Sequence, residues 1–158
     1  KAGVGFDGLL HYYKNEAINI KATARLNEHL NISSKKPTPY IVDCDLELAS
    51  IFENKPQVIS GYTGTNLGFY GPQGRKLRLQ LEDPDFIDQL ASFKHNDYKI
   101  TNLEMETSAI YSLAKMLGHG ALSLNAIIAN RANGEFSQDP KAAVKKLIKF
   151  TLDQLALH

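Results

Sequence analysis

Residues 102–109 read Asn-Leu-Glu-Met-Glu-Thr-Ser-Ala and stand where a polar segment gives way to an apolar one. Glu106 can accept hydrogen bonds from two neighbouring hydroxyl groups, and Met105 offers a soft apolar surface beside it. This pair suits a sugar, with the carboxylate on the hydroxyls and the thioether on the carbon face. A helix N-terminus with acidic residues that favour the helix dipole is the alternative interpretation of the same spacing.

The residues that follow predict a helix from about Glu104 to Leu117. Apolar side chains recur there at offsets of three and four, as a helix with one buried face requires. They are Ala109, Ile110, Leu113, Ala114 and Leu117. Gly118 is expected to end this helix. A mostly apolar run over 121–129 then predicts a short buried strand, with Asn130 and Arg131 at its exit.

A second motif, residues 69–75, reads Phe-Tyr-Gly-Pro-Gln-Gly-Arg and follows a predicted strand over 57–65. Loops after strands are where open α/β sheets bind ligands. Gln73 offers an amide donor and acceptor side by side, which match a ligand edge that carries a carbonyl next to an N–H. Arg75 can donate to a carbonyl oxygen, and Phe69 can lie against a base or a ribose. A surface turn is the competing interpretation, because Gly-Pro-Gln-Gly is strong turn chemistry.

Predicted strands alternate with predicted helices, which indicates an α/β fold, with three layers expected. Asp43 is expected to cap a helix that ends near Glu53, and Asp83-Pro84 to begin another. Asp139-Pro140 opens the last helix, whose lysines are expected outward on a solvated face. Its inward side chains are expected to be Val144, Leu147, Ile148, Thr151 and Leu155.

The Gly-rich start over 2–8 is interpreted as a turn. It lacks the phosphate-loop pattern, and Asp7 within it would repel a phosphate. Cys44 is expected to be an inert structural cysteine, because no histidine or second cysteine stands near it in the sequence.

Composition excludes several classes of protein. The 158 residues contain 43% hydrophobic and 22% charged residues, which is ordinary for one globular domain. A net charge of +1 gives no argument for binding nucleic acid or a membrane surface, and no apolar run approaches the roughly 20 residues of a membrane span. A single cysteine cannot form an internal disulfide, which favours a reducing, cytoplasmic setting.

Together the two motifs resemble the nucleoside phosphorylases. Glu-Met-Glu, the helix, the Gly turn, the apolar strand and Asn130-Arg131 resemble their ribose-binding region. The 69–75 loop resembles the uracil-binding loop of uridine phosphorylases, which reads Phe-Tyr-Pro-Gly-Gln-Glu-Arg. Here Gly71 and Pro72 are exchanged and Gly74 replaces the acidic residue. Purine-cleaving relatives carry an aspartate at the strand exit, and this sequence has none there.

The resemblance implies the fold and the extent of the domain. Residues 1–158 correspond to the C-terminal portion of a single nucleoside phosphorylase domain, a three-layer αβα fold of the phosphorylase/hydrolase-like kind. Its mixed central sheet is expected to be incomplete here, because the N-terminal half is absent. The start at Lys1, and not at Met, agrees with a piece of a longer protein.

The resemblance also implies the reaction, in which uridine and phosphate give uracil and ribose 1-phosphate in nucleoside catabolism and pyrimidine salvage. Glu106 and Arg75 are the expected catalytic residues. The expected ribose-binding residues are Met105, Glu106 and Glu104, and the expected base-binding residues are Phe69, Gln73, Arg75, Asn130 and Arg131. No metal and no cofactor are expected, and inorganic phosphate is the second substrate.

The resemblance finally implies partners. The phosphate-binding groups are expected from the N-terminal half and from an adjacent subunit of a homo-oligomer built from dimers, either a dimer or a hexamer. This chain has four arginines, too few for a separate phosphate cluster. Two alternatives stay open, namely a nucleoside hydrolase of the same fold and an inactive nucleoside-binding or structural module.

Overall fold

A five-stranded mixed sheet forms the centre of the computed structural model, which describes residues 1–14, 17–130 and 133–158. Its strand order is β2-β1-β3-β5-β4. The middle strands β1, β3 and β5 run parallel, while β2 and β4 pair antiparallel at the two edges. The strands are β1 (Ala2–Gly5), β2 (Tyr40–Asp43), β3 (Tyr62–Thr65), β4 (Lys94–His95) and β5 (Tyr98–Glu104).

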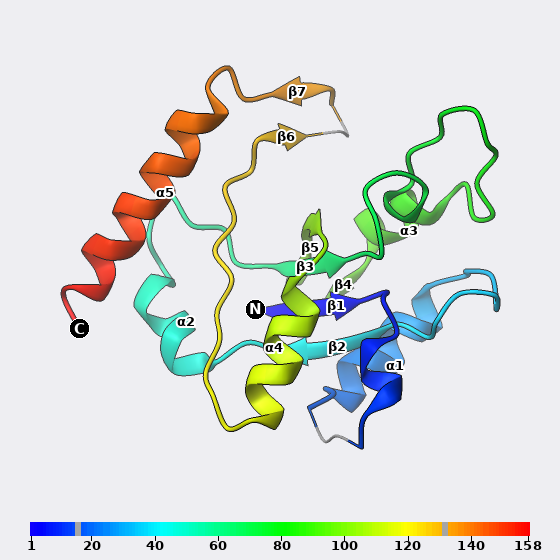
Figure 1. The fold of residues 1–158 in the computed structure, drawn as a ribbon, viewed down its shortest axis with the longest axis horizontal. Coiled ribbons are helices and arrows are strands. Elements are labelled where there is room, and N and C mark those ends of the chain that lie inside the picture. Colours follow the sequence, from blue (N-terminus) through cyan, green and yellow to red (C-terminus); the bar gives the residue numbers. More distant parts are fainter. Residues whose placement is uncertain (15–16, 131–132) are drawn as a thin grey trace.

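Helices cover both faces of this sheet, so the three-layer α/β prediction is confirmed (Figure 1). On one face, α1 (Ile20–His29) and α3 (Phe86–Ser92) pack against the apolar side chains of β1. On the other face, α4 (Thr107–Met116) crosses β1, β2 and β3, and α2 (Leu46–Phe52) lies beside it. Two short 3₁₀ helices, η1 (Leu9–Tyr12) and η2 (Gly71–Gln73), follow β1 and β3.

The strand β1 shows why small residues occupy the middle of the sheet. Ala2 and Val4 point into the core with α1 and α3. Gly3 points the other way, where an added Cβ would lie 2.9 Å from the Cα of Ser108 in α4. Only glycine therefore lets α4 approach the sheet backbone this closely.

The interpretation of residues 2–8 as a turn is wrong for its first half. Ala2–Gly5 is a fully buried strand between β2 and β3. The turn comes afterwards, at Asp7 and Gly8, where Gly8 has a φ of 70°. The alternation of glycine with small apolar residues resembled a turn because the side chains that usually signal a strand would not fit under α4.

Two predicted helices are present, but each begins a few residues later than predicted. Asp45, and not Asp43, caps α2 by accepting a hydrogen bond from the amide of Leu48 at 2.8 Å. The helix α3 begins at Phe86, after the Asp83-Pro84 pair. Asp83 instead accepts from the amide of Ser33 and pairs with Lys36, so its carboxylate holds two distant loops together.

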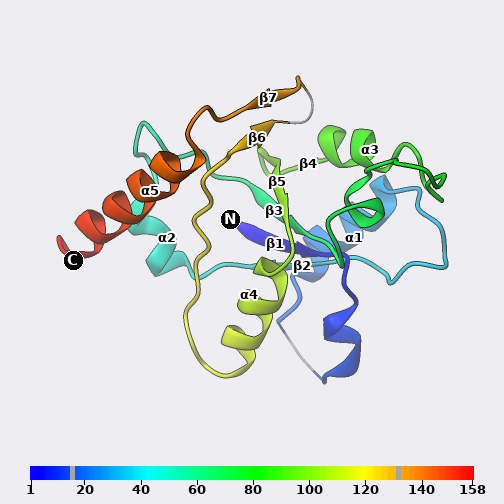
Figure 2. The same ribbon diagram turned by 45° about the horizontal axis from the view of Figure 1, so that its top comes forward.

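The predicted buried strand over 121–129 is wrong. Residues 121–128 form a long connection between α4 and β6 without regular secondary structure (Figure 2). Only β6 (Ala129–Asn130) pairs, and its partner is β7 (Glu135–Phe136) in a separate two-stranded sheet. The apolar run has the composition of a strand, but within the described ranges its backbone pairing with other segments lies at its two ends, where the carbonyls of Ala121 and Ile128 accept from the amides of Asp45 and Ser137.

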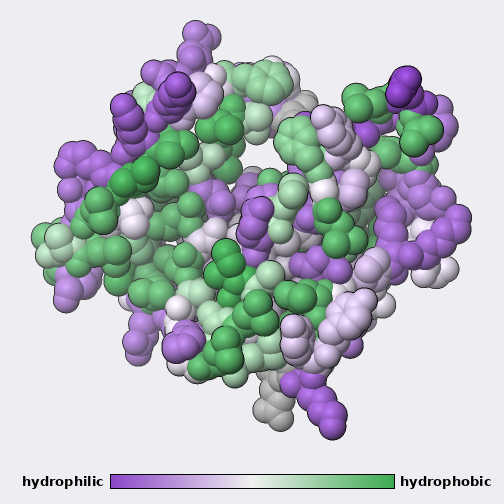
Figure 3. Space-filling view, viewed as in Figure 1, coloured by the Kyte–Doolittle hydropathy of each residue, from purple (hydrophilic) through white to green (hydrophobic). Residues whose placement is uncertain are grey.

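The last helix, α5 (Pro140–Leu155), begins where Asp139-Pro140 predicts, and Asp139 accepts from the amide of Ala142 at 2.9 Å. The expectation of an inward apolar face is wrong, because no residue of α5 is buried. Val144 is 44% exposed and Ile148 54%. One ring contact, between Phe150 and Phe52, joins α5 to α2. Figure 3 shows an apolar band over α5.

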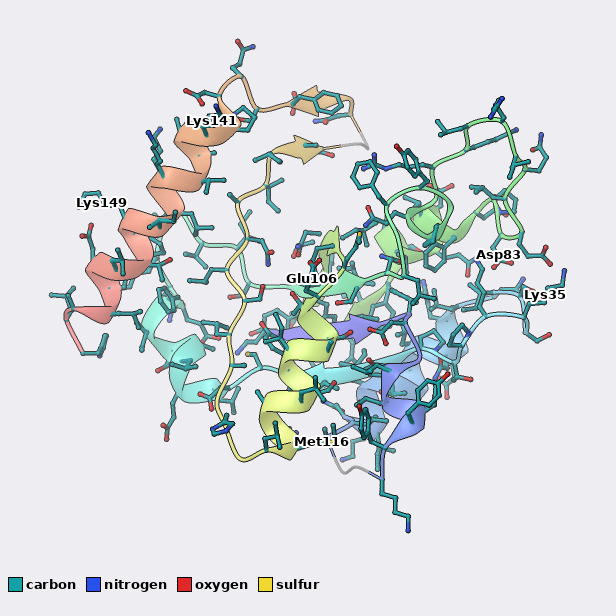
Figure 4. The ribbon with its side chains drawn as sticks, viewed as in Figure 1. Lys35, Asp83, Glu106, Met116, Lys141 and Lys149 are labelled. Carbon is teal, nitrogen blue, oxygen red and sulfur yellow. The ribbon has the colours of Figure 1, made fainter. Side chains whose placement is uncertain are left out.

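The outward lysines of α5 are confirmed, and Figure 4 shows Lys141 and Lys149 on its outer face. Lys149 pairs with Asp153 one turn further on. Within the described ranges, none of the helices is both long enough and apolar enough to cross a bilayer.

Candidate functional site

The carboxyl ends of the three parallel strands meet at one edge of the sheet. Gly5, Thr65 and Glu104 end β1, β3 and β5, and the amide of Phe6 donates to the carbonyl of Thr65 at 2.9 Å. In the same way, the amide of Asn66 donates to the carbonyl of Glu104 at 2.9 Å. Both predicted motifs therefore leave the sheet from neighbouring strands at the same edge, where open α/β sheets bind ligands.

The predicted sugar-binding pair forms the turn between β5 and α4. Glu106 stands at the N-terminal end of α4 (Figure 4), and its Oε2 accepts from the amide of Met105 at 3.2 Å. Both side chains are exposed, Met105 by 45%. The predicted helix start at Glu104 is two to three residues early, because these residues make the turn. A carboxylate and a thioether thus stand side by side on an open surface.

Glu104 differs from Glu106 in its surroundings. Its Oε1 accepts from the hydroxyl of Thr65 at 2.6 Å. Its Oε2 accepts from the amides of Glu106 and Thr107, each at 2.8 Å. Both oxygens of this carboxylate are therefore engaged within the chain, while those of Glu106 have a single weak contact with a neighbouring amide.

The predicted base loop follows β3. The 3₁₀ helix η2 closes it, and Gly74 has a φ of 72° where an added Cβ would strike Ile87, which only glycine avoids. Gln73 is buried, with 3% of its surface exposed, whereas Phe69 is 49% exposed. The guanidinium carbon of Arg75 lies 3.3 Å from the centre of the Phe69 ring. The loop therefore presents a stacked arginine and phenylalanine, with the glutamine enclosed behind them.

A cavity of about 600 Å³ lies against this loop and is mainly apolar. Arg75 and Asn66 line it, together with Phe6 and Phe86 from the core. It does not reach Gln73, Met105 or Glu106. The Nε of Arg75 and the Oδ1 of Asn66 are buried without a hydrogen-bond partner among the described residues, so the polar groups of this region are not fully satisfied.

Of the strand-exit pair, Asn130 lies in β6, in the small sheet and not in the central one. Arg131 lies outside the described residues.

A network around Asp7 was missed by sequence reasoning, which considered this residue only as a charge against phosphate. Its carboxylate accepts from the phenol of Tyr40 and from the hydroxyl of Ser108, both at 2.7 Å. Burial raises the pKa of Tyr40, so the phenol stays protonated and keeps donating. The network ties the ends of β1, β2 and α4 together beneath the edge that carries the motifs. An Asp-Gly pair after a strand is the signal that could have found it.

Cys44 is buried, and burial raises the pKa of its thiol. This agrees with an inert structural cysteine, because the thiolate is the reactive form. In the described parts of the chain, no three or more His, Cys, Asp or Glu side chains gather in a group suited to a metal ion.

Comparison with known proteins identifies the architecture. No family model and no curated protein sequence matches this chain. A solved structure does: a nucleoside phosphorylase from Trypanosoma brucei that shows uridine phosphorylase activity, with a TM-score of 0.77 and 23% sequence identity. The chain has the fold of a nucleoside phosphorylase. The match covers 100% of this chain and 57% of the trypanosome enzyme, so the chain spans little more than half the length of that protein.

The match covers only part of the trypanosome enzyme. The other 43% of the trypanosome enzyme, by subtraction of the covered share, has no counterpart in this chain. In the described chain, α5 has no buried residue and residues 121–128 have no regular secondary structure. The sequence prediction of an incomplete phosphorylase-like fold is therefore confirmed.

Proposed function

We propose that this chain is part of a nucleoside phosphorylase that acts on uridine, giving uracil and ribose 1-phosphate. One observation carries the proposal: the Met105–Glu106 turn and the 69–75 loop leave the adjacent parallel strands β5 and β3 at the same edge of a nucleoside phosphorylase fold. A sugar on the turn and a base on the loop then form one nucleoside across two neighbouring strand ends.

In this mechanism the bond between the anomeric carbon and the base nitrogen breaks, and its electron pair leaves with the base. A phosphate oxygen forms the new bond to the anomeric carbon from the opposite face, and the base anion takes up a proton to become uracil. Glu106 accepts hydrogen bonds from the ribose hydroxyls, and these bonds strengthen as the ring becomes positively charged. Glu106 is also free enough to do so, since its carboxylate is exposed.

Arg75 has the matching role at the base. It donates to a uracil carbonyl and stabilises the negative charge that develops there. Phe69 holds the guanidinium from one side. The proposed base contacts also include Gln73, Asn130 and Arg131. The proposed ribose region also includes Met105 and Glu104. Phosphate is the second substrate, and the reaction needs no cofactor and no metal.

The same proposal includes partners. We assign the phosphate-binding groups to a further polypeptide segment, equivalent to the part of the trypanosome enzyme that this chain lacks, and to a neighbouring subunit in a dimer-based oligomer. The uncovered apolar face of α5 suits that segment, because contiguous exposed apolar patches mark interaction sites. The enzyme would serve pyrimidine salvage in the cytoplasm, without contact to nucleic acid or membrane.

A uracil-release assay tests the proposal. Uridine is incubated with the protein in the presence and absence of inorganic phosphate, and uracil, ribose and ribose 1-phosphate are separated by chromatography. Phosphate-dependent formation of uracil and ribose 1-phosphate is the expected result. Equal uracil release without phosphate, together with free ribose, would make the protein a nucleoside hydrolase. Uridine binding without product would make it a binding module.

A further inference from the structure

One threonine hydroxyl connects the ends of two strands to the first turn of a helix. Thr65, the last residue of β3, is only 1% exposed. Its Oγ1 donates to Oε1 of Glu104 at 2.6 Å and accepts from the amide of Ser108 at 2.9 Å. Thr65 also stands directly opposite Glu104 in the β3–β5 register. The hydroxyl thus acts as donor and acceptor at once in a buried position.

Glu104 extends this connection to the turn itself. The oxygen that does not contact Thr65 accepts from the amides of Glu106 and Thr107. The backbone carbonyl of Glu104 accepts from the amide of Asn66, which continues β3. The amides of three successive residues, 106–108, are therefore held by the Thr65–Glu104 pair, two by the carboxylate and one by the hydroxyl.

The turn needs this support because its own side chains make few contacts with the rest of the chain. Met105 and Glu106 are exposed, and Glu106 has no side-chain cap bond to α4. The backbone at 106–108 therefore decides where the Glu106 carboxylate points. Displacement of a reacting or binding group by about 1 Å can cost about 10²-fold in rate.

We propose that Thr65 and Glu104 are positioning residues that fix the Met105–Glu106 turn and so aim the Glu106 carboxylate at the ribose. This inference rests on the proposed function for the identity of the sugar, but the hydrogen-bonded clamp itself does not. Glu104 acts through the backbone of the turn and needs no contact with the substrate. The clamp also explains why a half-buried carboxylate and a buried hydroxyl stand at the end of an otherwise ordinary strand pair.

The chain supplies a matched control. Thr63 lies two residues earlier in β3, is also buried, and donates from its hydroxyl to Oδ1 of Asn102 in β5 at 2.8 Å. It makes the same kind of cross-strand bond, but within the described ranges its hydroxyl has no hydrogen bond to residues 106–108. Thr63→Val therefore removes a comparable buried hydroxyl without releasing the turn.

Amide hydrogen exchange of the chain tests the clamp directly. Thr65→Val is expected to speed exchange at Ser108, Thr107 and Glu106 by about tenfold or more relative to Thr63→Val, with Thr65→Ser close to the unchanged protein. Glu104→Gln is expected to release Glu106 and Thr107 more than Ser108. Equal exchange in Thr65→Val and Thr63→Val would overturn the proposal, whatever the activity.

Kinetics test the consequence in the active assembly. Thr65→Val is expected to lower kcat for uridine by about 10²-fold with a smaller change in KM, and Thr65→Ser to restore most of the loss. A kcat for Thr65→Val no lower than that of Thr63→Val would also overturn the positioning role. If the unchanged protein releases no uracil in any assembly, the proposed function fails and the exchange experiment still decides whether the clamp exists.

Discussion

Arg75 lies over the ring of Phe69, with its guanidinium carbon 3.3 Å from the ring centre. A base cannot stack on that face of Phe69 while the arginine covers it. The guanidinium must therefore donate hydrogen bonds to the base through its N–H groups while it stays on the ring, or move away from the ring when the nucleoside binds.

The first prediction concerns Arg75. Arg75→Ala should lower the turnover of uridine by about 10²–10³-fold, as expected when a donor to developing negative charge is lost. A purine nucleoside tested as a second substrate should lose much less. Arg78→Ala is the control, because Arg78 lines the same cavity without stacking on Phe69. Equal losses for uridine and the purine nucleoside would exclude Arg75 as a base-recognising residue.

The second prediction concerns the exposed carboxylate. Glu106→Gln should reduce kcat more than it raises KM, with a loss of about 2.7–4 kcal/mol of transition-state stabilisation. The reason is that its hydrogen bonds to the sugar strengthen as positive charge develops. Glu47→Gln, at an exposed glutamate of α2, should change neither constant. Steady-state kinetics with an unchanged kcat for Glu106→Gln would remove this residue from the mechanism.

The third prediction concerns the contact between β1 and α4. Gly3→Ala should destabilise the chain by about 1–3 kcal/mol, because the new Cβ meets backbone atoms of Ser108 and Thr107 that cannot rotate away. Urea unfolding measures the loss. Gly118→Ala serves as a comparison at a position with open space, where the φ of 77° alone opposes the substitution. A stable Gly3→Ala protein would mean that α4 can move off the sheet at little cost.

The fourth prediction is a pH dependence. Burial raises the pKa of Tyr111 from its ordinary value of 10.0 to about 12. The folded state therefore holds the phenol proton more tightly than the unfolded state. Stability from this difference is complete below pH 10 and is lost as the pH rises from about 10 to 12.

Urea unfolding between pH 9 and 12 measures that loss, and Tyr111→Phe should make the decline shallower. It should not abolish the decline, because burial also raises the pKa of Tyr40 and Tyr62. Tyr12→Phe, at a residue that is 86% exposed, is the control. Identical slopes for the unchanged protein and Tyr111→Phe would show that this phenol does not contribute.

The fifth prediction concerns the chain by itself. We expect the 158 residues alone to show no phosphorolysis of uridine and to associate through the apolar face of α5. Addition of a segment equivalent to the rest of a nucleoside phosphorylase should restore phosphate-dependent uracil release and suppress the association. Light scattering and the uracil assay measure the two effects. Activity of the purified chain in proportion to its concentration would mean that it already contains a phosphate site.

The sequence by itself determined the local features. Asp139-Pro140 began α5, and Gly118 ended α4, where the amide of His119 donates to the carbonyl of Ala114 at 2.8 Å. These signals act over one helical turn, so neighbouring residues suffice to predict them. Periodicity likewise gave the alternation of helices and strands and the three layers, whereas the β3–β5 pairing that makes the two motifs neighbours is seen only in the structure.

Only the tertiary structure decided the features that depend on contacts between residues far apart in the sequence. Ala2–Gly5 is a central strand because α4 covers it. The residues of α4 lie about 100 positions further along the chain, so the sequence near the strand does not indicate this packing. Glu104 and Glu106 are similar carboxylates in sequence, but Thr65, 39 positions away, draws the first into the sheet and leaves the second exposed. Apolar side chains such as Ile128, Val144 and Ile148 suit a core, yet they are exposed because a core also requires a layer on the other side.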